Sequence, residues 1–474
     1  MALSPRKREQ LTAFLSGLPT VTAVKLFGAL EMDRAAGPGG LPHNDLLDDL
    51  RRRLLSQGAV LPARRHDARR IFFTPFEDFF VGERQGRKRP GVIPRTSLGP
   101  IWRIMMRETA LSEAAFAAAG LDDALQAGRE THDLQRGLFI AAEAGLGRLC
   151  DAALVEAGMR ERLEEALGDP AAFADMQELR RLLGGVDFFR QLQRTIPSGA
   201  SRLSEDHNYA LRTQFLSAHE QSPKLAAFLL LALKGRLEKP WNALGLYYHF
   251  ARSADERLHN ARDAAAALPE ALFEDLEALA RALERDCAAG EAFDAEASRL
   301  RVAYFADYAD GLASQAAKAG DNVLLNRVEA CRDVAAEAFE RFCELGLAAL
   351  RASLPVREAG GSRLMAPRPD YAYPLSARVV EKAGEAAAMI ADAPALAKRL
   401  GAAADVAGTI AGDARARLDG FANDLVTEIR AAEGAERKAA RRMLESVLTI
   451  ASPLLGEDER GLISDRASAA AITV

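Results

Sequence analysis

The chain contains few cysteines, and their spacing is not that of a metal or disulfide site. The four cysteines, Cys150, Cys287, Cys331 and Cys343, form no CxxC pair, and no histidine lies at zinc-ligand spacing from them. This pattern argues against a zinc ribbon and against a disulfide framework. We therefore predict buried free thiols and a reducing, cytoplasmic location.

Long apolar stretches are also missing. The longest run, Leu225 to Leu233, has nine residues, whereas a membrane-spanning helix needs about 20. The first residues lack the continuous apolar core and the small-residue cleavage site of a signal peptide. We predict a protein without a membrane segment, and a buried helix at the apolar run.

The familiar catalytic and nucleotide-binding motifs do not occur. The sequence has no G-x-G-x-x-G, G-x-x-x-x-G-K-[ST], G-x-S-x-G or H-E-x-x-H. Glu256 and His259 have the Glu-x-x-His spacing of di-iron bundles, but no other histidine follows an acid by three residues. His207 and His219, which have acids nearby, leave a metal site as a minor alternative. We predict no metal and no cofactor.

Most of the sequence follows a helical period. Alanine, leucine, glutamate and arginine dominate residues 111–354, whereas β-branched residues and strict alternation are sparse. We predict an all-α fold, either a multi-helix bundle or an irregular array of helical hairpins, with a short irregular basic and aromatic insertion near the N-terminus. Helix breaks are expected at Gly168-Asp169-Pro170, Pro197–Gly199, Ser222-Pro223, Lys239-Pro240 and Gly320-Asp321-Asn322.

The length of 474 residues implies two or three domains. We predict an N-terminal helical region at 1–110, a central helical domain at 111–354, a linker at 355–374 and a C-terminal helical region at 375–474. The linker is marked by four prolines and two glycines.

The most unusual stretch is residues 64–107, which we call the basic segment. It has ten arginines and one lysine against four acids, a net charge of +7, while the whole chain carries −5, so the remainder carries −12. It also holds five phenylalanines and one of the two tryptophans. Guanidinium groups beside rigid apolar side chains are typical of binding surfaces.

Local signals divide the basic segment into three parts. Thr74-Pro75-Phe76-Glu77 has the form of a capping box and predicts a short helix with a phenylalanine face. The glycines and prolines of residues 82–95 predict an exposed loop. A second helix is expected to begin at Ser97 or Gly99.

Part of the basic segment resembles a known ligand motif. Arg65 to Arg69 has the RxxxR spacing of PilZ-type cyclic-di-GMP receptors, which are β-barrels. The resemblance implies cyclic-dinucleotide binding by these two arginines. The family's second element, D/N-x-S-x-x-G, is matched only by Arg95 to Gly99, which lacks the Asp or Asn and has its glycine one position early. The surroundings predict helix, so we assign no family.

Several functions use the same residues. The leading prediction is a non-enzymatic cytoplasmic interaction or scaffold protein whose basic segment docks an acidic protein partner or the chain's own acidic helices. The alternatives are a binder of nucleic acid or of a phosphorylated nucleotide, and a helical enzyme with an unfamiliar pocket. The oligomeric state is left open. The candidate binding residues are Arg64, Arg65, Arg69, Arg70, Arg87, Arg89, Arg95, Ser97 and Trp102.

Overall fold

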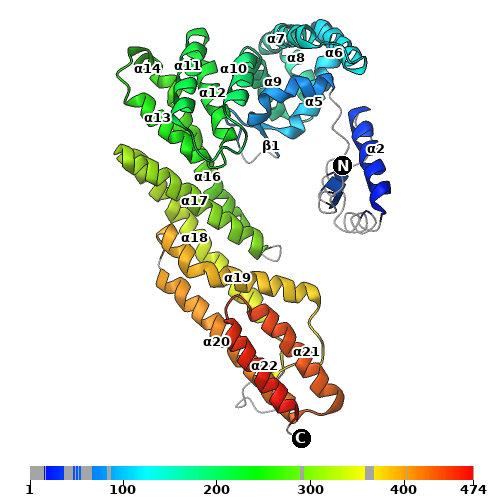
Figure 1. The fold of residues 1–474 in the computed structure, drawn as a ribbon, viewed down its shortest axis with the longest axis vertical. Helices are drawn as coiled ribbons and strands as arrows, with labels where there is room; N and C mark the ends of the chain where they lie inside the picture. Colours follow the sequence, from blue (N-terminus) through cyan, green and yellow to red (C-terminus); the bar gives the residue numbers. More distant parts are fainter. Residues whose placement is uncertain are drawn as a thin grey trace. The chain divides into compact units, whose positions relative to one another are not determined.

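The protein is mainly helical in the part that the structure describes. The computed structural model (Figure 1) describes residues 15, 18–36, 46–47, 50–51, 53–54, 67–82, 87–288, 293–357, 368–402 and 404–472. Helices make up most of these residues, and four strands of two residues each form two small sheets among them. The predicted all-α class is confirmed.

The helical elements follow one another along most of the described chain. In chain order they are α2 (Thr20–Ala36), α4 (Ala68–Phe73), η1 (Thr74–Phe79), α5 (Arg95–Arg107), η2 (Thr109–Leu111), α6 (Ser112–Gln126), α7 (His132–Val155), α8 (Ala157–Leu167), α9 (Pro170–Leu183), α10 (Val186–Thr195), α11 (Glu205–Gln221), α12 (Pro223–Arg236), η3 (Pro240–Asn242), α13 (Ala243–Ala251), α14 (Glu256–Asn260), α15 (Arg262–Ala265), α16 (Ala267–Cys287), α17 (Ala295–Ala319), α18 (Asn322–Ala352), α19 (Ala377–Leu400), α20 (Ala404–Ala431), α21 (Gly434–Ala451) and α22 (Glu457–Ile472). The strands are β1 (Phe80–Val81), β2 (Ile93–Pro94), β3 (Val356–Arg357) and β4 (Arg368–Pro369).

Contacts divide the chain into two compact units. The first comprises residues 1–71 and 120–131, and the second comprises residues 72–119 and 132–474. The first unit has its own apolar cluster, in which Phe27 of α2 packs with Leu47 and Leu50. The division at residues 110 and 355–374 that we predicted is a different one and stays a prediction.

Helix ends fall where the sequence places its breaks. Gly168 ends α8 at φ 74°, a left-handed conformation that glycine adopts without a Cβ penalty. The Asp169 side chain then accepts a hydrogen bond from the Ala171 N–H at 2.9 Å, and Pro170 begins α9. Gly320 and Asp321 repeat this arrangement between α17 and α18. These breaks were predicted, and they are confirmed.

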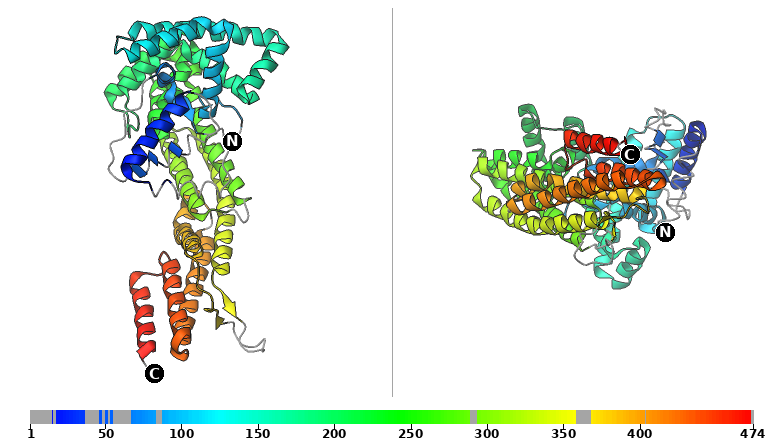
Figure 2. Two further views of the ribbon diagram at one scale, coloured as in Figure 1. Left: turned by 90° about the vertical axis from the view of Figure 1, so that its right-hand side faces the viewer. Right: turned by 90° about the horizontal axis from the view of Figure 1, so that it is seen from below.

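The C-terminal helices of the second unit pack in sequence order. α19 contacts both α18 and α20, and α20 contacts α21 and α22 (Figures 1 and 2). Leu418, Phe421, Leu425 and Ile429 are spaced along one face of α20 and form a buried stripe.

Part of the predicted linker packs on α20. β3 and β4 pair antiparallel, with Val356 opposite Pro369. The buried Glu428 carboxylate of α20 accepts hydrogen bonds from the Arg357 guanidinium at 3.0 Å and the Tyr371 hydroxyl at 3.2 Å. The described residues of this stretch are therefore fixed to α20. Whether the stretch separates two domains stays a prediction.

The apolar run Leu225 to Leu233 forms the middle of α12, and most of its side chains are buried. The buried helix that we predicted there is confirmed. In the part of the chain that the structure describes, no helix combines the length and the apolar character needed to cross a membrane.

The four thiols are expected to resist alkylation in the folded protein. Cys150, Cys331 and Cys343 are buried and free, and burial raises the pKa of the first two to about 11 and of Cys343 to about 12. The half-buried Cys287 donates its S–H to the Ala338 carbonyl oxygen at 3.2 Å, and burial raises its pKa too. At pH 8, a thiol with a pKa near 11 is a thiolate in only about one molecule in a thousand.

The measurement is the rate of iodoacetamide labelling at pH 8 with and without denaturant, followed by mass spectrometry. We expect slow labelling in buffer and rapid labelling of all four thiols in denaturant. Rapid labelling of the three buried thiols in buffer would contradict this structure.

Candidate functional site

The phenylalanines of the basic segment lie in the core of the second unit. Phe72, Phe76 and Phe79 are at most 1% exposed. The Phe72 ring stacks on Phe139 at 5.6 Å, and the Phe79 ring meets Phe189 edge to face at 5.2 Å. Such a cluster stabilises the fold by burial and ring contacts. These faces are therefore turned inward rather than toward a ligand in solvent.

The short helix of this segment is built differently from our prediction. α4 continues directly into the 3₁₀ helix η1, so Phe73, in a helical conformation, occupies the position before Thr74. The expected capping box at Thr74 is therefore wrong, because the preceding helix already occupies the position of the cap. The Glu77 side chain instead pairs with Arg95.

Lys88 joins the basic segment to α9. Its Nζ lies 3.0 Å from the Asp175 Oδ1 and 3.2 Å from the Glu178 Oε2, and it donates to the Val92 carbonyl oxygen at 2.6 Å. The Ser97 hydroxyl donates to the Asp175 Oδ2 at 2.7 Å. Asp175 is fully buried, so two polar groups of the basic segment hold one carboxylate inside the protein.

The backbone of the basic segment also contacts this cluster. The Gly91 N–H donates to the Glu178 Oε1 at 2.9 Å. Gly91 has φ 74°, and a Cβ there would press on the Leu231 side chain, so this close approach requires glycine. Burial raises the pKa of Glu178, while the Lys88 ammonium and the Gly91 N–H oppose that rise.

Arg89 joins the segment to a second, half-buried cluster. Its NH1 lies 2.8 Å from the Asp275 Oδ1 of α16, and the Lys234 Nζ lies 2.5 Å from the Asp275 Oδ2. The Tyr308 hydroxyl donates to the same Oδ2 at 3.4 Å. Burial and the nearby Asp275 charge raise the pKa of Tyr308 well above its ordinary value, so Tyr308 remains a hydrogen-bond donor.

Two expectations for this region are corrected by these contacts. Residues 82–95 were predicted to be an exposed loop; residues 83–86 lie outside the described residues and Arg87 and Pro90 are exposed, but Ile93 and Pro94 are buried in β2, which pairs parallel to β1. The next helix, α5, begins at Arg95 rather than at Ser97 or Gly99. Ser97 is buried and bonded to Asp175, so its hydroxyl faces an acid and not an open anion site.

The other candidate residues do not gather at one site. Arg64 and Arg65 lie outside the described residues. Arg69 and Arg70 are half-buried on α4, while Arg87 is exposed.

Arg95 pairs with Glu77 at the surface and lies over the Phe80 ring. The half-buried Trp102 lies 5.6 Å from the Phe72 ring.

The residue that sequence reasoning missed is Lys88. Its partners, Asp175 and Glu178, lie far from it in the sequence, and no local pattern connects them with it. Asp175 and Glu178 share one face of α9 at a three-residue spacing. Two acids that are buried on one helix face require a nearby cation, and this requirement points to a residue such as Lys88.

The two histidines considered as metal ligands, His207 and His219, make structural contacts. The His207 backbone N–H donates to the Ser204 hydroxyl, and its side chain accepts from the Ser204 N–H, which together cap α11. The His219 ring stacks on Phe215. Within the described ranges, no group of three or more His, Cys, Asp or Glu side chains is arranged to hold a metal ion.

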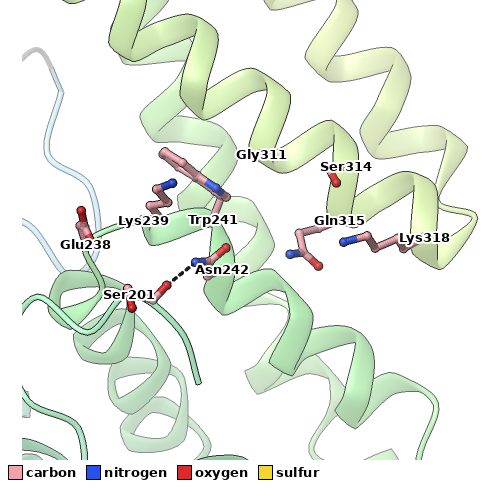
Figure 3. Close-up of a pocket in the computed structure, with 9 residues that line it drawn as sticks. All are labelled: Ser201, Glu238, Lys239, Trp241, Asn242, Gly311, Ser314, Gln315 and Lys318. Carbon is pink, nitrogen blue, oxygen red and sulfur yellow. Dashed lines mark hydrogen bonds between the residues drawn. The ribbon is translucent and has the colours of Figure 1, made fainter. Parts of the chain in front are cut away.

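A separate polar cavity lies between η3 and α17. It has a volume of about 400 Å³ and is lined by residues that include Lys239, Trp241, Asn242, Gln315 and Lys318. Figure 3 shows Gln315 and Lys318 extending from α17 toward Asn242, with the Lys239 side chain beside Trp241. Trp241 is buried, and the sequence analysis did not identify the two lysines.

Comparison with known proteins gives no relative for this chain: no family model, no curated protein and no solved structure matches it.

Proposed function

We propose that the protein is a non-enzymatic cytoplasmic scaffold or interaction protein, and that its basic segment docks onto the chain's own helices to keep their surface rigid. The observation that carries this proposal is the pairing of Lys88 with Asp175 and Glu178, and of Arg89 with Asp275. These cations sit on acids of the same compact unit.

The internal ion pairs limit which cations of the basic segment an acidic partner could bind. A partner carboxylate at Lys88 would have to displace two acids that lie within 3.2 Å of the ammonium. Displacement would leave Asp175 buried without its cation, which is costly in a low-dielectric interior. An acidic partner on this segment would therefore meet the exposed Arg87 first.

The test of this proposal is the free energy of unfolding of Lys88→Met, with Arg87→Ala as the matched control. Lys88→Met removes the cation between two buried acids, and we expect a loss of about 2–3 kcal/mol. Arg87→Ala changes an exposed side chain and should stay within about 0.5 kcal/mol. Urea denaturation followed by circular dichroism measures both. Equal, small effects would contradict internal docking.

The same two variants separate the alternatives. If the segment binds nucleic acid, the parent protein shifts a DNA duplex at low salt, the shift weakens steeply with added salt, and Arg87→Ala reduces it. If it docks an acidic protein, Arg87→Ala keeps the parent stability but loses a partner captured by the parent protein. Internal docking predicts that Arg87→Ala causes neither a reduced DNA shift nor the loss of a captured protein.

A further inference from the structure

We propose that the cavity between η3 and α17 binds a small oxyanion, a phosphate monoester or a carboxylate of metabolite size. This inference is independent of the proposed function, because it concerns a different part of the second unit. The volume of about 400 Å³ is within the range of small-molecule sites. It is too small for a nucleic-acid groove.

The charge of the cavity favours an anion. Lys239 and Lys318 line it together with one acid, Glu238. Within the described part of the chain, neither ammonium group is paired with a carboxylate, unlike Lys88 and Lys234. Both lysine side chains are exposed, and each ammonium group can attract an oxyanion in the cavity and donate a charge-assisted hydrogen bond to it.

Neutral groups around the lysines can complete the coordination of an oxyanion. Ser201, Ser314 and Gln315 line the same cavity and offer hydroxyl and amide donors. One side-chain N–H of Asn242 donates to the Ser201 carbonyl oxygen at 2.8 Å (Figure 3). That bond fixes the Ser201 loop against η3, so one wall of the cavity is preformed.

The other wall is fixed as well. Gly311 lies directly against the Trp241 indole, which holds η3 close to α17. At the end of α17, the Arg252 guanidinium donates to the Lys318 carbonyl oxygen at 3.1 Å, and the Tyr248 hydroxyl donates to the Asp321 carboxylate at 3.0 Å. A preformed site binds with less ordering of its own side chains, which favours affinity for a small ligand.

The test uses Trp241 as the reporter. Trp102→Phe leaves Trp241 as the single tryptophan, since the chain has two. Inorganic phosphate is titrated at constant ionic strength, and a saturable change in emission is expected. Lys239→Met and Lys318→Met should each weaken phosphate binding by about tenfold or more. Lys224→Met, which removes an exposed lysine of α12, should leave affinity within about twofold of the parent.

Two further measurements make the result decisive. Calorimetry with the same phosphate titration provides a readout that does not depend on fluorescence. A parallel titration with acetate distinguishes the ligand sources: a response to phosphate alone indicates a phosphate monoester, and a response to both indicates a carboxylate site as well. The proposal is overturned if neither method detects saturation, or if both lysine variants bind phosphate as the parent does.

Lys318 also lies in the last turn of α17, where a cation complements the helix dipole. Its replacement can therefore cost a few tenths of a kcal/mol of stability without any ligand. Melting curves of each variant without phosphate measure this effect separately. Loss of phosphate binding with an unchanged melting temperature assigns the lysine to the ligand, whereas a lower melting temperature with parental binding counts against it.

Discussion

Replacing Arg236 with alanine is expected to lower the free energy of unfolding by about 3–5 kcal/mol. The Arg236 NH1 lies 2.9 Å from the Asp78 Oδ1 and 3.0 Å from its Oδ2, and the Nε donates to the Ile196 carbonyl oxygen at 2.5 Å. The two charged side chains are only 9% and 7% exposed. Their pairing connects the end of α12 to η1, and alanine would leave a carboxylate buried and unpaired.

A second arginine, Arg95 of α5, provides the control. Arg95 pairs with Glu77, the neighbour of Asp78 in η1, but these side chains are 50% and 52% exposed. Water screens and solvates such a pair, so Arg95→Ala should cost no more than about 1 kcal/mol. Denaturant unfolding of both variants measures the difference. Similar losses would show that burial does not control the strength of these pairs.

The effect of Arg236→Ala should depend on pH. Burial already raises the pKa of Asp78, and the Arg236 charge opposes that rise. Without the arginine, the folded-state pKa moves further above the unfolded value, so the folded variant takes up a proton first as the pH falls. The ionised Asp78 destabilises the variant above its folded pKa, and that loss diminishes as the pH falls through it. The stability difference from the parent should therefore be smaller at pH 5 than at pH 7.

The pattern of the sequence was sufficient to predict the helices but not the ion pairs. Helix breaks such as Gly168-Asp169-Pro170 depend on backbone preferences of adjacent residues, which can be recognised locally. Arg236 and Asp78 are 158 residues apart, and the chain offers 67 acids to its 62 lysines and arginines. No local rule selects one acid from so many. The partner is set by how α12 packs on η1.

The same argument explains the error at residues 82–95. Glycine and proline mark turns reliably, but they do not indicate whether a turn faces solvent. Here Ile93 and Pro94 form a strand of two residues, too short for an alternating pattern, and Lys88 reaches acids on α9. The net charge of −12 outside the basic segment indicated that acids are available to pair with its cations. It could not identify Asp175 or Glu178 as the partners.

The second large effect is expected at Gly311, where alanine should lower the free energy of unfolding by about 3 kcal/mol. A Cβ at this position would overlap the Trp241 indole. Trp241 is 8% exposed and packs edge to face on Tyr308 at 5.2 Å, so moving the indole away from a Cβ would disrupt this contact. Alanine favours helix over glycine by up to about 1 kcal/mol, which offsets only part of this overlap.

Gly420→Ala is the matched control, because nothing lies within 4 Å of a Cβ at this glycine of α20. There the helix preference acts alone and should stabilise the protein by about 0.5–1 kcal/mol. The two variants thus make the same chemical change with opposite expected signs. Denaturant unfolding measures stability, and Trp241 emission in the Trp102→Phe background reports whether the indole becomes more exposed. If Gly311→Ala also stabilises the protein without a change in emission, then Trp241 does not lie against α17, and the preformed wall of the oxyanion cavity would not exist.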